Sequence, residues 1–176
     1  MSDGRRILSL LALLSALLLP AIAARADQIP GQLSPTQMRQ LRSQPLPILV
    51  PAYVPSGFRL VRVEAQRGNP NDYSLRYAAS DGREFNISVA DGGFGDADPD
   101  YTSYRRPFVV NSAIVGSATM QPYKFESADS SQWVYSSDYR SLSRLGNQRA
   151  ILTFEGIKMT PADLRRIYSS LQSVPR

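Results

Sequence analysis

The sequence predicts an α+β fold: a curved antiparallel β-sheet of the meander type, with a short N-terminal helix and an amphipathic C-terminal helix packed on one side. Two observations support this prediction. A proline-capped helix start stands near each end of the chain, and the segment between them shows two-residue hydrophobic periodicity with short turns. Strands joined by short turns, without helices between them, form antiparallel rather than parallel sheets.

Residues 1–26 have the three parts of a cleavable signal peptide. The pair Arg5-Arg6 gives a positive start, an apolar stretch runs from Ile7 to Leu19, and Ala24 and Ala26 form an A-x-A site for signal-peptidase recognition. The stretch is shorter than the ~20 residues of a membrane-spanning helix, so an uncleaved anchor is the weaker interpretation. Export through the general secretory route or, given the arginine pair, the twin-arginine route is expected.

Cleavage at Ala26 would leave a free domain with no membrane span. It removes three arginines and Asp3, so the net charge falls from +5 to +3. The chain has no cysteine, which excludes disulfides and lipid attachment through a thiol. The remaining charge is mild and forms no run of like sign, which argues against nucleic acid as a partner. The expected location is extracytoplasmic: periplasm, the exterior or, in a cyanobacterial host, the thylakoid lumen.

Residues 27–48 are predicted to form a short helix followed by a proline-rich linker. Ser34 is placed to cap the helix, Pro35 to occupy its first position, and Gln37 to complete a capping box. Leu33 and Met38 have the spacing of a hydrophobic staple. The helix is expected to stop before the prolines at positions 45 and 47.

Residues 49–176 are predicted to form a β-rich domain that ends in a helix. Alternation marks strands at 58–60, 73–79 and 85–89, and the Asp81-Gly82 pair between the last two predicts a hairpin. Tyr73 and Tyr77 alternate with polar neighbours and are assigned to the sheet core. Further strands are expected at 108–110, 114–120, 133–135 and 150–154.

The C-terminal helix repeats the pattern of the first. Thr160 caps it, Pro161 opens it and Asp163 occupies the third position, where a carboxylate favours the helix dipole. Met159 and Leu164 form the staple. Apolar residues at 164, 167, 168 and 171 then define one buried stripe, with Arg165 and Arg166 turned outward.

The composition excludes several kinds of chemistry. With neither histidine nor cysteine, the usual general base, transition-metal ligands and thiolate nucleophile are missing. A serine–lysine pair would have only Lys124 and Lys158, and neither lies in an S-x-x-K motif. We therefore expect no enzyme and no cofactor.

The acidic loop that contains Asp96, Asp98 and Asp100 is a weak calcium candidate. Its oxygen ligands alternate on a glycine-rich stretch, but an EF-hand would need glycine at Tyr101 and glutamate at Pro107. A flexible turn is the simpler interpretation.

The stretch Val50-Pro51-Ala52-Tyr53-Val54-Pro55-Ser56-Gly57-Phe58 resembles the P-x-Y-[LV]-P-x-G-F opening of a domain of unknown function. That domain occurs in secreted bacterial proteins and in anti-sigma-factor-like proteins. The loop from Gly92 to Asp96 is similar to one in exported cyanobacterial proteins. The resemblance covers roughly residues 50 to 173 and implies a β-rich extracytoplasmic module of unknown activity. The chain differs from the anti-sigma examples in lacking a cytoplasmic domain and a stop-transfer helix.

Three functions are consistent with these features. The first is an exported non-catalytic module that binds a protein or another envelope component. The second is a carrier for a lipid or other apolar ligand in the concave face of the sheet. The third is an envelope-polymer hydrolase that uses an Asp/Glu pair, with Asp96, Asp98 and Asp100 as its candidates. If side chains fill the core against the sheet, surface recognition is favoured, whereas a hollow core favours a ligand inside.

Overall fold

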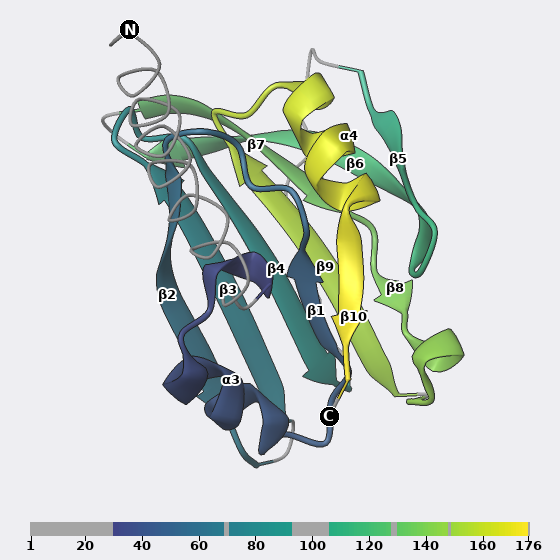
Figure 1. The fold of residues 1–176 in the computed structure, drawn as a ribbon. Coiled ribbons are helices and arrows are strands. Elements are labelled where there is room, and N and C mark those ends of the chain that lie inside the picture. The colour runs from purple at the N-terminus through teal and green to yellow at the C-terminus, as the bar shows by residue number, and fades with distance from the viewer. Residues whose placement is uncertain (1–29, 69–70, 93–105, 128–129, 148, 176) are drawn as a thin grey trace, which may run out of the picture.

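The computed structural model describes residues 30–68, 71–92, 106–127, 130–147 and 149–175. Within them a large antiparallel sheet is covered on one face by two helices and a two-stranded ribbon (Figure 1). The sheet consists of β2 (Phe58–Gln66), β3 (Asp72–Ala79), β4 (Glu84–Asp91), β5 (Phe108–Ser112), β6 (Gly116–Ser127), β7 (Ser130–Ser137), β8 (Arg140–Ser141) and β9 (Ala150–Ile157).

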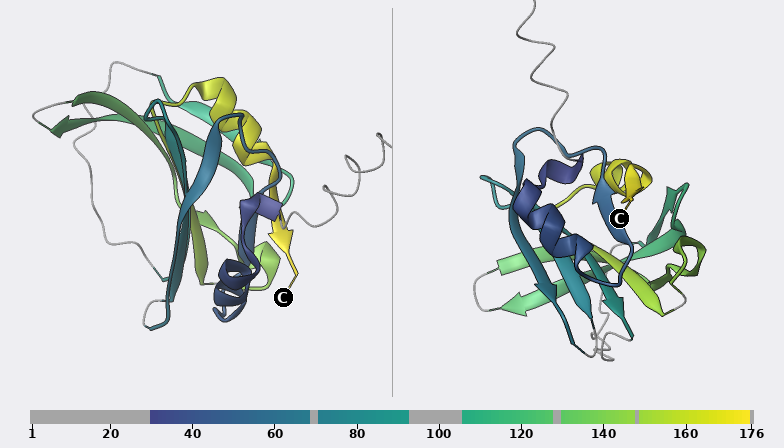
Figure 2. Two further views of the ribbon diagram at one scale, coloured as in Figure 1. Left: turned by 60° about the vertical axis from the view of Figure 1, so that its left-hand side comes forward. Right: turned by 60° about the horizontal axis from the view of Figure 1, so that its bottom comes forward.

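The predicted α+β fold is confirmed, and the sheet is built from two meanders joined by one late strand. The strand order is β2-β3-β4-β9-β7-β6-β5, and β8 also pairs with β9. β9 pairs with β4 along its whole length but with β7 only at residues 155–157. The two halves therefore diverge beyond this junction, and the hairpin of β6 and β7 projects away from the helices (Figure 2).

The β3–β4 hairpin forms at the predicted Asp81-Gly82 turn. Gly82 has φ 79°, a left-handed conformation that glycine adopts without steric cost. Its N–H donates to the Ala79 carbonyl at 3.1 Å, and the Asp81 carboxylate accepts from the Arg83 N–H at 3.1 Å. The turn chemistry of the sequence thus sets the register of both strands.

Helix α3 (Pro35–Arg42) begins as its sequence predicts. The Ser34 hydroxyl accepts from the Gln37 N–H at 3.2 Å, and the Gln37 side chain accepts from the Ser34 N–H at 2.8 Å, which completes the capping box. Leu33 and Met38 are both buried, as the predicted staple requires. The helix ends at Ser43, before the prolines.

A short turn before α3, η1 (Pro30–Gln32), protects the edge of β2. The Gln32 side-chain amide accepts from the Leu60 N–H at 3.0 Å and donates to the Phe58 carbonyl at 3.3 Å, as a neighbouring strand would. Gly31 lies so close to Val50 and the Tyr77 hydroxyl that a Cβ there would meet both at 2.9 Å. This close approach seats Gln32 against a strand edge that would otherwise be open.

Helix α4 (Pro161–Ser169) begins at its predicted cap, where the Thr160 hydroxyl accepts from the Asp163 N–H at 3.1 Å. Leu164, Ile167 and Tyr168 are buried, which confirms most of the predicted stripe. Leu171, predicted as the stripe's last member, begins β10 (Leu171–Val174) instead. Its side chain is still buried, so the pattern identified a core position but not its secondary structure.

The inner face is also covered by a ribbon in which β10 pairs with β1 (Ile48–Pro51), and neither strand is predicted by the sequence analysis. All four residues of β1 are buried, so they show no alternation from which a strand could be recognised. Leu41 and Leu46 join the same core. The segment expected to act partly as a linker therefore contributes to the packing of the domain.

The space between sheet and cover is filled by aromatic side chains. Tyr77 stacks on Phe85 with ring centroids 4.5 Å apart, and Phe154 packs against Tyr168 at 5.5 Å. Tyr73 and Tyr77 are buried as predicted. The Tyr73 hydroxyl donates to the Pro47 carbonyl and accepts from the Leu49 N–H, both at 2.8 Å. These bonds attach the sheet to the segment that covers it.

Strand β6 begins two residues later than predicted, at Gly116 rather than at residue 114. The tight turn that precedes it ends at Gly116, which has φ 81°. Across the described parts of the chain, no helix has the length and apolar character needed to cross a membrane.

Candidate functional site

The outer face of the sheet, which neither helices nor ribbon cover, carries a row of polar side chains that crosses six strands. Strand pairing places these residues directly opposite one another from β2 to β6. The members of this polar row, in order, are Arg62, Arg76, Asn86, Glu155, Ser136 and Gln121. Because side chains alternate between the two faces of a strand, all six lie opposite the aromatic core.

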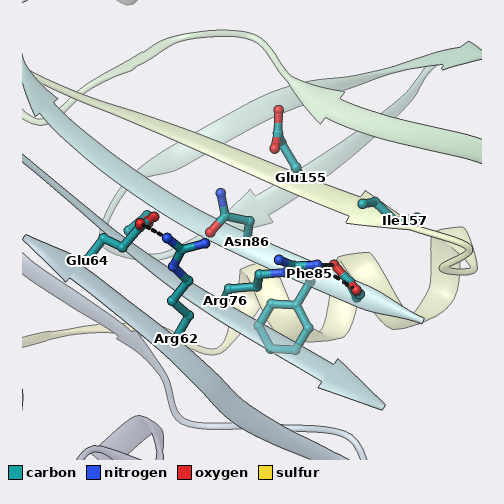
Figure 3. A pocket seen from close by; sticks show the side chains of 9 residues that line it. Arg62, Glu64, Arg76, Phe85, Asn86, Glu155 and Ile157 are labelled. Carbon is teal, nitrogen blue, oxygen red and sulfur yellow. Dashed lines mark hydrogen bonds and ion pairs between the residues drawn. The ribbon is translucent and has the colours of Figure 1, made fainter. Parts of the chain in front are cut away.

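The first four members of the polar row line a hollow of about 200 Å³. Its polar lining includes Arg62, Arg76, Asn86 and Glu155 of the row, and it also includes Glu64, Ser74 and Glu84 from the neighbouring positions (Figure 3). The hairpin of β6 and β7 extends beyond this region on the side away from α4 (Figure 2). The hollow thus lies on the outer face of β2, β3, β4 and β9, which supply all of its lining residues.

Both arginines of the row are held by glutamates. Arg76 donates through Nε and Nη2 to the two carboxylate oxygens of Glu84, each at 2.8 Å. Arg62 forms an ion pair with Glu64, which also accepts from the Ser74 hydroxyl at 3.3 Å. Without acidic partners, two like charges directly opposite each other on neighbouring strands would destabilise the sheet. The two glutamates remove this repulsion and fix the guanidinium planes.

Glu155 is the carboxyl group at the junction between the two halves of the sheet. It is half-buried, and among the described residues no lysine or arginine forms an ion pair with it. Burial raises the pKa of Glu155, while hydrogen bonds from the side chains of Asn86, Tyr123 and Ser136 act in the opposite direction. Its side chain points away from the Arg62–Glu64 pair (Figure 3).

Asn86 lies between the arginines and Glu155. Its Nδ2 donates to the Ser88 hydroxyl at 2.9 Å, and its amide also donates to Glu155. The Oδ1 atom is buried and has no hydrogen-bond partner among the described residues. A buried acceptor without a donor costs free energy, so this atom favours a ligand N–H or O–H.

The carboxylates around the hollow differ in whether an arginine holds them. Glu64 and Glu84 are each engaged with an arginine, and no group of three or more His, Cys, Asp or Glu residues among the described positions could hold a metal ion. Larger hollows of about 600 and 650 Å³ lie elsewhere. The first shares Glu64 and Ser74 with the hollow on the outer face, and the second is lined mainly by prolines and aliphatic residues near the chain's C-terminal end.

The structure does not test the site residues named from the sequence. Ala24 and Ala26, and the acidic positions Asp96, Asp98 and Asp100, lie outside the described residues. Arg76 and Asn86 lie in the predicted strands 73–79 and 85–89, where they are the polar members of the alternation, but no local pattern marked them as site residues. Glu155 was missed, although the alternation of 150–157 gives the signal, because nothing local shows that β9 pairs with β4.

The chain was compared with family models, with curated proteins and with solved structures, and no match was found in any of the three.

Proposed function

We propose that this chain is an exported, non-catalytic module that binds an envelope component through the outer face of its sheet. One observation carries the proposal: Asn86 lines the hollow on the outer face, and its buried amide oxygen, Oδ1, has no hydrogen-bond partner within the described parts of the protein. The filled inner face supports surface recognition, because aromatic side chains already occupy the space between sheet and cover.

The experiment is a pull-down in which immobilised protein is incubated with a solubilised envelope fraction. We expect the wild type to retain a reproducible component, and Asn86→Ala and Arg76→Ala to lose it. Arg42→Ala is the matched control, since it removes an exposed arginine from α3 on the opposite side of the molecule. Circular dichroism of each variant checks the fold. Equal retention by all four proteins would contradict a binding site on the outer face.

Export is tested separately on the full chain expressed in a bacterial host. The signal-like residues 1–26 lead us to expect the mature protein outside the cytoplasm with Asp27 at its N-terminus, because Ala24 and Ala26 fit the peptidase site. Mass spectrometry of the extracytoplasmic fraction measures this end. A chain that keeps residues 1–26 and stays inside the cell would overturn this part of the proposal.

The two alternatives are supported less well. A carrier would have to displace the stacked rings of Tyr77, Phe85 and Phe154 to seat a ligand against the concave face. A hydrolase would need a second carboxylate beside Glu155 that is free of an arginine, and the glutamates at 64 and 84 are engaged. The acidic loop residues proposed for that role remain a sequence hypothesis.

A further inference from the structure

The polar row runs across the strands rather than along one of them. Its six residues occupy consecutive strands, and neighbouring strands lie ~4.8 Å apart, so the row spans roughly 24 Å. An elongated ligand that contacts every member must therefore lie nearly perpendicular to the strand direction. This geometry restricts the kind of molecule that fits.

We propose that the polar row binds a neutral glycan strand, which lies across the outer face and uses hydroxyl and amide groups to bond successive side chains. The proposal rests on the function assigned above and adds the chemistry of the envelope component. It follows from three properties of the row: its charge balance, its mixture of donors and acceptors, and its position on the face rather than at an edge.

The charge balance favours a ligand without net charge. Arg62 and Arg76 supply the positive charge, and Glu64 and Glu84 neutralise it at contact distance. Anionic polymers bind where cationic side chains are left uncompensated. Here they would meet three carboxylates, those of Glu64, Glu84 and Glu155, and only two guanidinium groups. A neutral polymer avoids this repulsion.

The hydrogen-bonding groups are mixed in type along the row. Asn86 offers the buried acceptor Oδ1, while each arginine has five N–H donors, of which Arg76 uses two on Glu84. Ser136 and Gln121 add a hydroxyl and a primary amide, both half-buried. Sugar hydroxyls act as donor and acceptor at once, so one ring can satisfy Asn86 and an arginine together. A polymer of such rings repeats this pairing along the row.

A peptide ligand fits this surface less well. Extended peptides gain most of their affinity by adding a strand to a sheet edge, where backbone groups are free. In the row, the backbones of β3, β4 and β9 are already paired on both sides. A lipid is disfavoured because seven of the nine side chains that line the hollow are charged or polar, and only Phe85 and Ile157 are apolar.

The test is calorimetric titration of the full mature protein with soluble β-linked N-acetylglucosamine oligomers of increasing length. We expect longer oligomers to bind more tightly, because they contact more of the row. Asn86→Ala, and independently Arg62→Ala, should weaken binding by at least roughly tenfold, the factor that corresponds to 1.4 kcal/mol. Arg42→Ala and Asn111→Ala should bind like the wild type, since both residues are exposed and lie outside the row.

Gln121→Ala protects the test against a folding artefact, because Gln121 lies at the far end of the row and removing its amide leaves Asn86 and Glu155 in place. This substitution should weaken the binding of long oligomers more than the binding of short ones. Binding that does not depend on oligomer length, or that survives all three row substitutions, would overturn the proposal.

A second experiment distinguishes a failure of the glycan proposal from a failure of the proposed binding function. Envelope polymer that has been stripped of protein by protease and detergent should still retain the wild type but not Asn86→Ala. If protease treatment abolishes retention while the intact envelope component remains sensitive to Asn86→Ala, the partner is a protein and the glycan assignment is wrong. If no preparation distinguishes the variants, the binding function itself fails.

Discussion

The two faces of the sheet use the same strands for opposite purposes. On the inner face, Tyr77, Phe85 and Phe154 exclude water, and the tyrosine hydroxyls of residues 73 and 77 bond backbone groups of the covering segment. On the outer face, Arg76, Asn86 and Glu155 stand at the alternate positions: Arg76 is bonded to Glu84, Glu155 accepts from Asn86, and the Asn86 Oδ1 has no partner among the described residues. The difference shows that alternation separates residues that stabilise the fold from residues available for recognition.

We expect the largest loss of stability from a substitution on the inner face of the sheet. Phe85→Ala removes a fully packed ring that contacts Phe58, Tyr77 and Phe154. We expect a loss of ~3–5 kcal/mol in the free energy of unfolding, measured by chemical denaturation, because the cavity cannot close completely. Val61→Ala is the control: Val61 is 56% exposed at the irregularity in β2, so the loss there should stay below about 0.5 kcal/mol. Similar losses at both positions would contradict the packing.

The next largest change in stability is expected from removing the hydroxyl group of one of two buried tyrosines. Tyr73→Phe leaves the Pro47 carbonyl and the Leu49 N–H without their partner, so we expect a loss of ~1–3 kcal/mol. Tyr168 is equally buried, burial raises its pKa to about 12, and its hydroxyl has no hydrogen-bond partner among the described residues. Tyr168→Phe should therefore be neutral or stabilising in the same denaturation experiment. Equal destabilisation by both changes would show that Tyr168 is bonded after all.

A smaller, pH-dependent effect is expected at Glu155. Because burial raises its pKa in the folded protein, the folded state binds the proton more tightly than the unfolded state does. The resulting stability is fully present at low pH and is lost as the pH rises through the raised pKa. The stability of the wild type relative to Glu155→Gln should therefore fall as the pH rises above about 4. Thermal unfolding of both proteins across this range measures the difference.

Asp81 provides a control for which the stability should change with pH in the opposite direction. A hydrogen bond from the Arg83 backbone N–H lowers the pKa of Asp81, so its contribution is present at neutral pH and disappears as the pH falls through that lowered value. The stability of the wild type relative to Asp81→Asn should rise with pH. If both comparisons had slopes of the same sign, Glu155 would not be a carboxyl with a raised pKa.

The smallest stability change is expected from the outer arginine at the end of the row. Both partners of the Arg62–Glu64 pair are more than half exposed, and such pairs contribute little to stability. Arg62→Ala should therefore change the free energy of unfolding by no more than about 0.5 kcal/mol, while it weakens the proposed glycan binding at least roughly tenfold. A large loss of stability would show that Arg62 supports the fold, and its loss of binding could then not be assigned to recognition.

The sequence by itself determined the fold class, the two capped helices, the β3–β4 hairpin and the burial of Tyr73 and Tyr77. These features depend on local chemistry: a side chain that caps a helix, a glycine that accepts positive φ, and alternation that separates two faces. The sequence also predicts an export signal in residues 1–26, which lie outside the described part of the structure, so the signal stays a prediction. Local signals reach only a few residues along the chain.

Only the tertiary structure decided which strands became neighbours. β1 and β10 pair across more than a hundred residues and lack alternation, so no local pattern predicts them. β9 enters the sheet between β4 and β7, and this placement puts Glu155 beside Asn86 and Ser136. The candidate site therefore exists because strand pairing aligns side chains from six separate segments, and pairing is decided by the packing of the whole sheet against its cover.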